Sequence, residues 1–186
     1  MVKEYEIKVK VSDDVFNNVR SALIKLGGIF KGKVVEDDYY VDLRKCSGVD
    51  DVVFRIRIKD VYGIKKGELT IKGPKQVNRS VRIRDELSIE LNNAEELVRM
   101  LGNMGFKIIH LRKEREEYSL NGLNLFLDKV MCLGKYIEVE ILSMDEENDA
   151  TAKLHEVMSV LGITGESISK SYLELMQEVG GRCEES

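Results

Sequence analysis

Polar and apolar residues alternate strictly along residues 4–11, which is the pattern of a β-strand with one buried face. Glu4 and Glu6 fall on one face of this stretch, and Tyr5 and Ile7 fall on the other. The stretch therefore predicts a strand that packs its apolar side on a core and turns its charged side away from it.

Similar patterns recur further along the chain, and hairpin-length turns separate most neighbouring stretches. The later predicted strands cover residues 34–43, 52–59, 67–72, 80–91, a stretch from 106, 123–131 and 135–142. Helical spacing of apolar residues predicts fewer helices, which lie between Ser12 and Gly27, between Asn93 and Gly102, and at about 147–161 and 170–178.

Eight strands joined largely by hairpins favour an antiparallel sheet that closes on itself, because closure removes the exposed edges of a long sheet. We therefore predict an α+β fold with an eight-stranded antiparallel barrel, closed or nearly closed, and flanking helices. The chain has 186 residues, no internal repeat and no Gly/Ser-rich linker. We expect a single domain over residues 1–178 and a C-terminal tail at 179–186.

Charged residues gather on one face of strand after strand. Arg55 and Arg57 share one such face and Lys113 and Arg115 share another. The other strands add Glu4, Glu6, Lys8, Lys72, Arg82, Arg84, Glu86, Asp128, Glu138 and Glu140. A single face of this kind is typical of the solvated side of a β-sandwich. The recurrence favours a barrel with a charged, wet lumen that holds an anion and its cations, because burying so many charges without ligands is costly.

Composition narrows the class of partner. Hydrophobic residues make up 43% of the chain and charged residues 33%, and the net charge of −4 lacks the basic excess of nucleic-acid binders. No stretch approaches the ~18 apolar residues of a membrane helix, and the start has no signal-peptide core, so we expect a cytoplasmic protein without a membrane partner. The two histidines lack the spacing of a zinc site. The three widely spaced cysteines predict thiols rather than a disulfide framework.

A triphosphate would need such a lumen, since its charges require several arginines and lysines that converge from different directions. It also travels with magnesium, and carboxylates two positions apart on a strand project toward the same point, as hard cations require. Glu4-x-Glu6 and Glu138-x-Glu140 have this spacing, and Asp128 lies on the neighbouring strand. Glu114-x-Glu116 has it too, but this pair falls on the face opposite Lys113 and is predicted to lie outside.

These residues resemble a known family. Glu4-x-Glu6-x-Lys8 resembles the E-x-E-x-K signature of the CYTH superfamily, the triphosphate tunnel metalloenzymes that include class IV adenylyl cyclases and thiamine triphosphatases. The resemblance continues in order along nearly the whole chain, through Asp37-x-Tyr39-Tyr40, Arg55-x-Arg57, Thr70-Ile71-Lys72-Gly73-Pro74, Arg84-Asp85-Glu86, Lys113-x-Arg115, Asp128, residues 133–140 and residues 169–175. The motif at 133–140 and the short chain are closest to the class IV cyclase branch.

The resemblance implies a role for each matching residue. It implies that one or two Mg²⁺ or Mn²⁺ ions are bound by Glu4, Glu6, Asp128, Glu138 and Glu140. It implies that phosphates are bound by Lys8, Arg55, Arg57, Lys72, Lys113 and Arg115, with Arg84 and Lys170 as further candidates. Glu86 is expected to orient these cations or to join the metal shell. Local alternatives are an Arg84–Glu86 ion pair and a Lys170 that is an ordinary helix residue.

Two reactions fit this set of residues, because charge neutralisation and positioning dominate phosphoryl transfer. In a cyclase, the ribose 3′-hydroxyl of ATP attacks the α-phosphorus and pyrophosphate leaves. In a triphosphatase, water attacks the terminal phosphate of thiamine triphosphate, a nucleoside triphosphate or tripolyphosphate. Lys8 or Lys72 is a candidate proton acceptor in either reaction. A non-catalytic binder of nucleotides or polyphosphate is a third possibility, and the oligomeric state is left open.

Overall fold

The computed structural model describes residues 2–43, 48, 51–78, 80–143 and 147–180. Apart from residues 179 and 180, the predicted C-terminal tail lies outside the described residues. The division into one domain over 1–178 and a tail stays a prediction.

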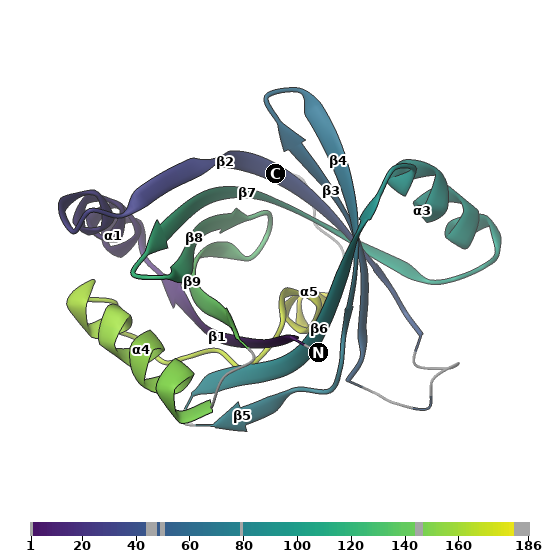
Figure 1. Cartoon of the computed structure of the whole chain (residues 1–186). Coiled ribbons are helices and arrows are strands. Elements are labelled where there is room, and N and C mark those ends of the chain that lie inside the picture. The colour runs from purple at the N-terminus through teal and green to yellow at the C-terminus, as the bar shows by residue number, and fades with distance from the viewer. Residues whose placement is uncertain (1, 44–47, 49–50, 79, 144–146, 181–186) are drawn as a thin grey trace.

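Nine strands and four helices are present in the described part of the chain (Figure 1). The strands are β1 (Val2–Val11), β2 (Ile29–Val41), β3 (Val53–Val61), β4 (Ile64–Lys72), β5 (Gln76–Asn78), β6 (Val81–Leu91), β7 (Ile108–Leu120), β8 (Leu123–Val130) and β9 (Gly134–Ser143). The helices are α1 (Asp13–Lys25), α3 (Ala94–Asn103), α4 (Glu147–Val160) and α5 (Tyr172–Glu178).

Eight of the strands form a closed antiparallel barrel in the order β1-β9-β8-β7-β2-β3-β4-β6. Closure is made by β6, whose first half pairs with β1 from Arg82 to Glu86 while its second half pairs with β4. The short strand β5 is not part of the ring. It pairs with the start of β6, along the edge opposite the one that pairs with β1. The predicted eight-stranded antiparallel barrel with flanking helices is therefore confirmed.

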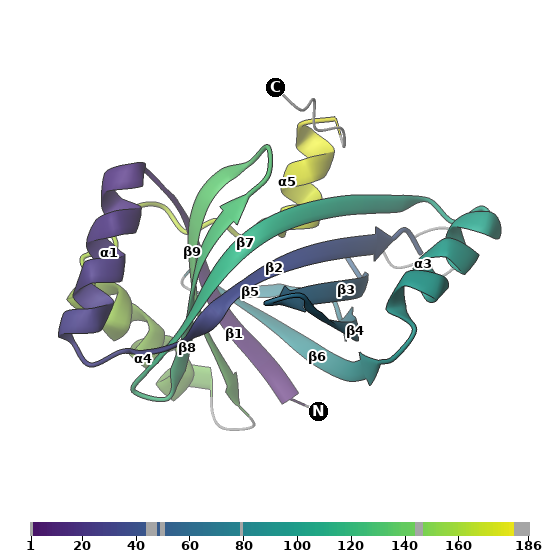
Figure 2. The ribbon, with the colours of Figure 1, turned by 90° about the horizontal axis from the view of Figure 1, so that it is seen from above.

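The alternation in the sequence decides which side chains face the lumen. On β1, Tyr5, Ile7 and Val9 point outward into a core that α1 and α4 cover, and the glutamates between them point inward. Smaller cores lie under α3 and beside α5. Figure 2 shows α1 and α4 together beside the barrel, α3 at the opposite side, and α5 at one mouth. The helices therefore cover much of the apolar outside, and the charged faces are left to the inside.

Several details differ from the sequence predictions. Strand β2 begins at Ile29 rather than at residue 34, because its first residues pair with the far end of β7 across a register shift at Phe30/Gly32. Strand β5, which has three residues, was not predicted. The prediction of thiols is wrong for Cys132, which is disulfide-bonded; the other two cysteines lie outside the described residues. No helix among the described residues is both long and apolar enough to cross a membrane.

Candidate active site

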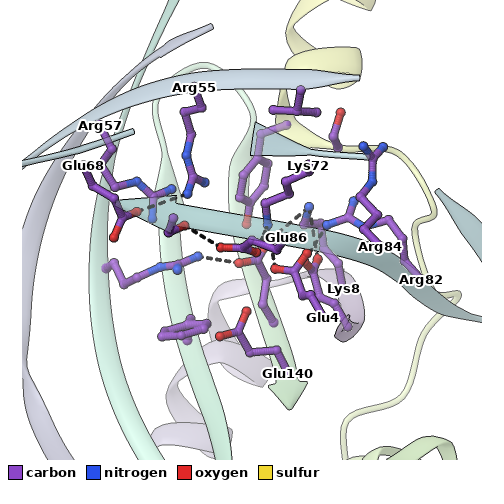
Figure 3. Close-up of a pocket in the computed structure, with 18 of the residues that line it drawn as sticks. Glu4, Lys8, Arg55, Arg57, Glu68, Lys72, Arg82, Arg84, Glu86 and Glu140 are labelled. Atoms are coloured by element: carbon purple, nitrogen blue, oxygen red, sulfur yellow. Dashed lines mark hydrogen bonds and ion pairs between the residues drawn. The ribbon is translucent and has the colours of Figure 1, made fainter. Parts of the chain in front are cut away.

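The lumen of the barrel contains a cavity of about 300 Å³ whose walls are largely charged (Figure 3). Strands on opposite sides of the barrel contribute to it, since each candidate residue occupies the inward face of its strand. The predicted site residues that line it are Glu4, Glu6, Lys8, Arg55, Arg57, Lys72, Arg84, Lys113, Arg115, Glu138 and Glu140. The structure thus brings together all of the predicted site residues except Asp128 and Lys170.

Three of the lining carboxylates form a group that we call the carboxylate trio, which consists of Glu4, Glu6 and Glu140. One oxygen from each lies within 4.8 Å of the other two. The spacing follows from the fold, because Glu4 and Glu6 are two positions apart on β1 and Glu6 lies opposite Glu140 on β9. Burial, together with repulsion from Glu4 and Glu6, raises the pKa of Glu140 to about 8.

The carboxylate trio fits a divalent cation. It offers hard oxygen donors, and the buried Oε1 of Glu6 has no hydrogen-bond partner among the described residues. A bound cation would also offset the burial and the repulsion from Glu4 and Glu6 that raise the pKa of Glu140. The residues present therefore suit a hard metal ion such as Mg²⁺ or Mn²⁺.

The other two predicted metal ligands, Asp128 and Glu138, are not part of the carboxylate trio. Asp128, which is 0% exposed, accepts hydrogen bonds from Arg115 at 2.7 and 2.6 Å and from the Tyr172 hydroxyl at 2.9 Å. Glu138 pairs with Lys8 at 3.0 Å and also with Arg115. Both carboxylates thus pair with cationic side chains in this structure, and direct binding of a metal ion by either of them stays a prediction.

The predicted phosphate-binding residues are held in place by carboxylates on neighbouring strands. Arg57 on β3 donates to Asp38 on β2 through Nε at 2.5 Å and through Nη2 at 2.8 Å, in the two-pronged arrangement that a guanidinium makes with a carboxylate. Lys72 on β4 donates to Glu4 at 2.6 Å and lies 2.9 Å from Glu86. The cations therefore have fixed positions before any ligand binds.

Two lumen arginines keep unused donors. Arg82 donates through Nη2 to Glu6 at 2.5 Å, but its Nε and Nη1 have no hydrogen-bond partner among the described residues, although both are buried. Arg55 donates to the Thr70 hydroxyl at 3.0 Å, and its buried Nε likewise has no partner among them. Buried donors of this kind are costly, and an anion in the lumen would satisfy them.

Sequence reasoning missed the buried carboxylates that support this wall. Glu36 and Asp38 on β2 are each 0% exposed. Glu36 lies 3.1 Å from both Arg57 and Lys113. Alternation along β2 places these two residues on the same face as Tyr40, so the sequence contained a signal for them. Only the register of β2 with β3 and β7 shows which cationic side chains they contact. Arg82 lies on one of the predicted charged faces but is not among the predicted site residues.

The two candidate proton acceptors have different environments. Burial lowers the pKa of Lys8, and the nearby charge of Arg82 adds to this effect, although Glu6 and Glu138 oppose it. Burial would also lower the pKa of Lys72, but the charges of Glu4 and Glu86 outweigh it and raise the pKa. Lys8 is thus better suited than Lys72 to lose a proton, and the catalytic role of either stays a prediction.

Two further predicted residues differ from the rest. Arg84 lines the lumen and donates to Asp51 at 2.7 Å and to the Gly73 carbonyl at 3.0 Å, rather than to Glu86 as in the alternative of a local ion pair. Lys170 is half-exposed, pairs with Glu178, and is not among the residues that line the cavity. The structure therefore favours the interpretation of Lys170 as an ordinary helix-end residue.

The fold and the cavity together define a class of protein, namely closed β-barrels whose lumen combines anion-binding cations with a carboxylate site suited to a metal ion. The model of the CYTH domain matches residues 2–172. The chain therefore belongs to the CYTH family, as the sequence resemblance predicted. Members of this family are metal-dependent adenylyl cyclases or triphosphatases that bind triphosphate substrates in the tunnel.

Individual relatives agree with this assignment. A Methanocaldococcus jannaschii protein named "putative adenylate cyclase" is 33% identical over 177 residues, which cover 92% of this chain and 97% of the relative. A solved structure of a conserved hypothetical protein from Pyrococcus furiosus matches with a TM-score of 0.78 and 28% identity, over 92% of this chain and 99% of the other. A solved Pyrococcus horikoshii protein matches with a TM-score of 0.77 and 29% identity, over 95% and 99%.

Proposed function

We propose that this protein is a metal-dependent enzyme that acts on a nucleoside triphosphate inside the barrel, and that its reaction is the conversion of ATP to cyclic AMP and pyrophosphate. The observation that carries the proposal is the convergence of fixed cations and the carboxylate trio on one lumen. The cyclase name of the 33% identical relative supports cyclisation as the reaction.

Each group of residues has a distinct part in this proposal. Arg55 and Arg82 use their free donors to bind phosphate oxygens, and Lys72 and Lys113 add positive charge around them. The carboxylate trio holds the metal ion, which neutralises charge that develops on the phosphates when it is bound. In cyclisation, the 3′-oxygen forms a bond to the α-phosphorus, the bond to the β-phosphate oxygen breaks, and the 3′-hydroxyl proton passes to a nearby base. Lys8, beside Glu138, is the candidate for that base.

Hydrolysis is the second candidate reaction. The free donors in the lumen would bind phosphate oxygens, and inorganic tripolyphosphate has a chain of three phosphates, as ATP does. Water would then attack the terminal phosphorus, and the bond to the next phosphate oxygen would break. The metal site and the cations required for this reaction are the same.

The deciding experiment follows ³¹P NMR spectra while the protein is incubated with ATP or with tripolyphosphate, each with Mg²⁺ or Mn²⁺. Cyclic AMP with pyrophosphate identifies the cyclase, and ADP with phosphate identifies the triphosphatase. Tight binding without any product would refute the enzyme and leave a non-catalytic binder.

A variant of the carboxylate trio tests the metal site in the same assay. Glu140→Gln removes one hard oxygen donor and its charge, so we expect it to abolish metal-dependent turnover and to weaken Mn²⁺ binding. Glu114→Gln is the matched control, because Glu114 is exposed on the outside of the barrel, where it pairs with Lys33 at 2.7 Å. Equal turnover in both variants at limiting metal would exclude the trio as the metal site.

A further inference from the structure

A second cavity of about 280 Å³ adjoins the lumen at the mouth where α5 lies. The two cavities share wall residues, namely Tyr40 at the end of β2, Val53 at the start of β3 and Ser171 before α5. The two cavities are therefore neighbours, and a ligand that occupies both would pass beside these three residues. We call this second space the mouth pocket.

The mouth pocket differs chemically from the lumen. Its walls include apolar side chains from several elements, namely Val41, Leu43, Val52, Val53, Ile109 and Leu173. Two of its acidic residues are already occupied, because Asp51 accepts hydrogen bonds from Arg84 and from the Lys75 backbone amide, and Glu174 accepts from Lys75 and Ser171. The mouth pocket thus suits a flat, largely apolar group rather than another phosphate.

Arg84 lies at the boundary between the two spaces. Its guanidinium lines the lumen, and the carboxylate that holds it, Asp51, lines the mouth pocket. Figure 3 shows Arg84 on the side of the site near α5, with Arg55 and Arg57 on the opposite side. A triphosphate whose phosphates bind the unused Nε of Arg55 in the lumen would have the mouth pocket available for its organic end.

We propose that the mouth pocket binds the nucleobase of the substrate, and that Gln177 of α5 recognises a purine edge there; this rests on the proposed function. Gln177 is exposed, lines the mouth pocket, and carries an amide that both donates and accepts. An amide of this kind pairs with adenine through the neighbouring N6 donor and N7 acceptor. The apolar walls supply contact area for the ring, and the amide supplies the preference for adenine.

The test compares the binding of ATP, GTP and inorganic tripolyphosphate by isothermal titration calorimetry with Mg²⁺. Leu173→Trp fills the mouth pocket, and we expect it to weaken ATP binding at least tenfold while tripolyphosphate binding changes less than twofold. Gln177→Ala is expected to reduce the preference for ATP over GTP at least fivefold. Gln76→Ala is its matched control, since Gln76 is exposed on β5 and is not among the residues that line either cavity.

The outcomes separate this proposal from the proposed function. An equal loss for ATP and tripolyphosphate in Leu173→Trp, or an unchanged preference in Gln177→Ala, overturns the nucleobase site. If Leu173→Trp fails to fold, as judged by its thermal melt, the exposed Gln177→Ala variant decides alone. Selective ATP binding by the unaltered protein without any product would refute the enzyme and still support the mouth pocket. Binding of neither ligand would refute both.

Discussion

The pairing of Asp38 with Arg57 gives a stability prediction whose size follows from the structure. Asp38 is fully buried beneath the lumen wall. Burial by itself would raise the pKa of this carboxyl, but the charges of Arg57 and Arg55 outweigh burial and lower the pKa from 3.8 to about 2. Asp38→Asn keeps the shape of the side chain and removes the charge, so it imitates the protonated carboxyl.

The expected loss of unfolding free energy in Asp38→Asn equals the free energy that corresponds to the lowered pKa of Asp38. A fall in pKa from 3.8 to about 2, at 1.36 kcal/mol per pH unit, corresponds to roughly 2 to 3 kcal/mol at pH 7. This is below the ~3–5 kcal/mol typical of a buried charge left without its partner. The smaller cost is reasonable because Glu36 still lies 3.1 Å from Nη1 of Arg57.

The sign of the pH dependence is also fixed. Because the pKa of Asp38 is lower in the folded state, its stabilising contribution is complete above the unfolded pKa of 3.8 and is lost as the pH falls through about 2. The difference in unfolding free energy between the unaltered protein and Asp38→Asn should therefore be roughly 2 to 3 kcal/mol at pH 7 and about half of that near pH 3.

Urea unfolding followed by circular dichroism measures this difference at each pH. The control is Asp37→Asn, one position along β2, where the carboxylate faces outward and pairs with His110 at 2.8 Å and Arg112 at 3.1 Å. Exposed pairs of this kind contribute ~0–1 kcal/mol, so the control should change little. A cost at position 38 no larger than at position 37, or a cost that does not shrink at low pH, would refute the reasoning.

Three further variants test other parts of the structure. Arg82→Lys keeps the charge but loses the free Nε and Nη1 donors, so tripolyphosphate binding measured by calorimetry should weaken at least ~10-fold. Lys170→Ala should leave kcat/KM for ATP within about twofold, since Lys170 pairs with Glu178 outside the lumen cavity; a large loss would restore its predicted phosphate role. Gly67→Ala should lower the unfolding free energy by more than ~1 kcal/mol in urea, because the new Cβ would lie 2.2 Å from the Leu91 carbonyl oxygen; an unchanged midpoint would contradict this.

The fold was predictable because most strands show the alternation of polar and apolar residues in their own sequence. Alternation on β1 sends Tyr5 and Ile7 outward and Glu4 and Glu6 inward, and closure of the sheet then follows from the number of strands and the short connections. The early part of β2 lacked such a signal. Ile29 and Phe30 are exposed in the folded protein, and only the length of β7 beside them shows that they belong to the sheet.

The site was predictable residue by residue but not pair by pair. Inward-facing arginines and glutamates can be identified from spacing along one strand, whereas the partner of each depends on the register between strands. Arg57 meets Asp38 because β3 pairs with β2 at that position. A motif match alone did not show where Lys170 lies relative to the lumen. This residue comes just before α5, and its distance from the lumen depends on how α5 packs against the barrel, which the motif does not specify.

The distribution of partners in the lumen predicts a preference for a highly charged ligand. Arg57 and Arg115 already bind carboxylates through two nitrogens each, so a weakly charged anion gains little by competing for them. Arg55 and Arg82 keep free donors on different strands, β3 and β6. One phosphate has only one centre of charge with which to reach such separated donors, whereas a chain of phosphates can meet several of them and bring its metal ion to the carboxylate trio. Selectivity for a triphosphate would then arise from the donors that the fold leaves unpaired rather than from the total number of cations.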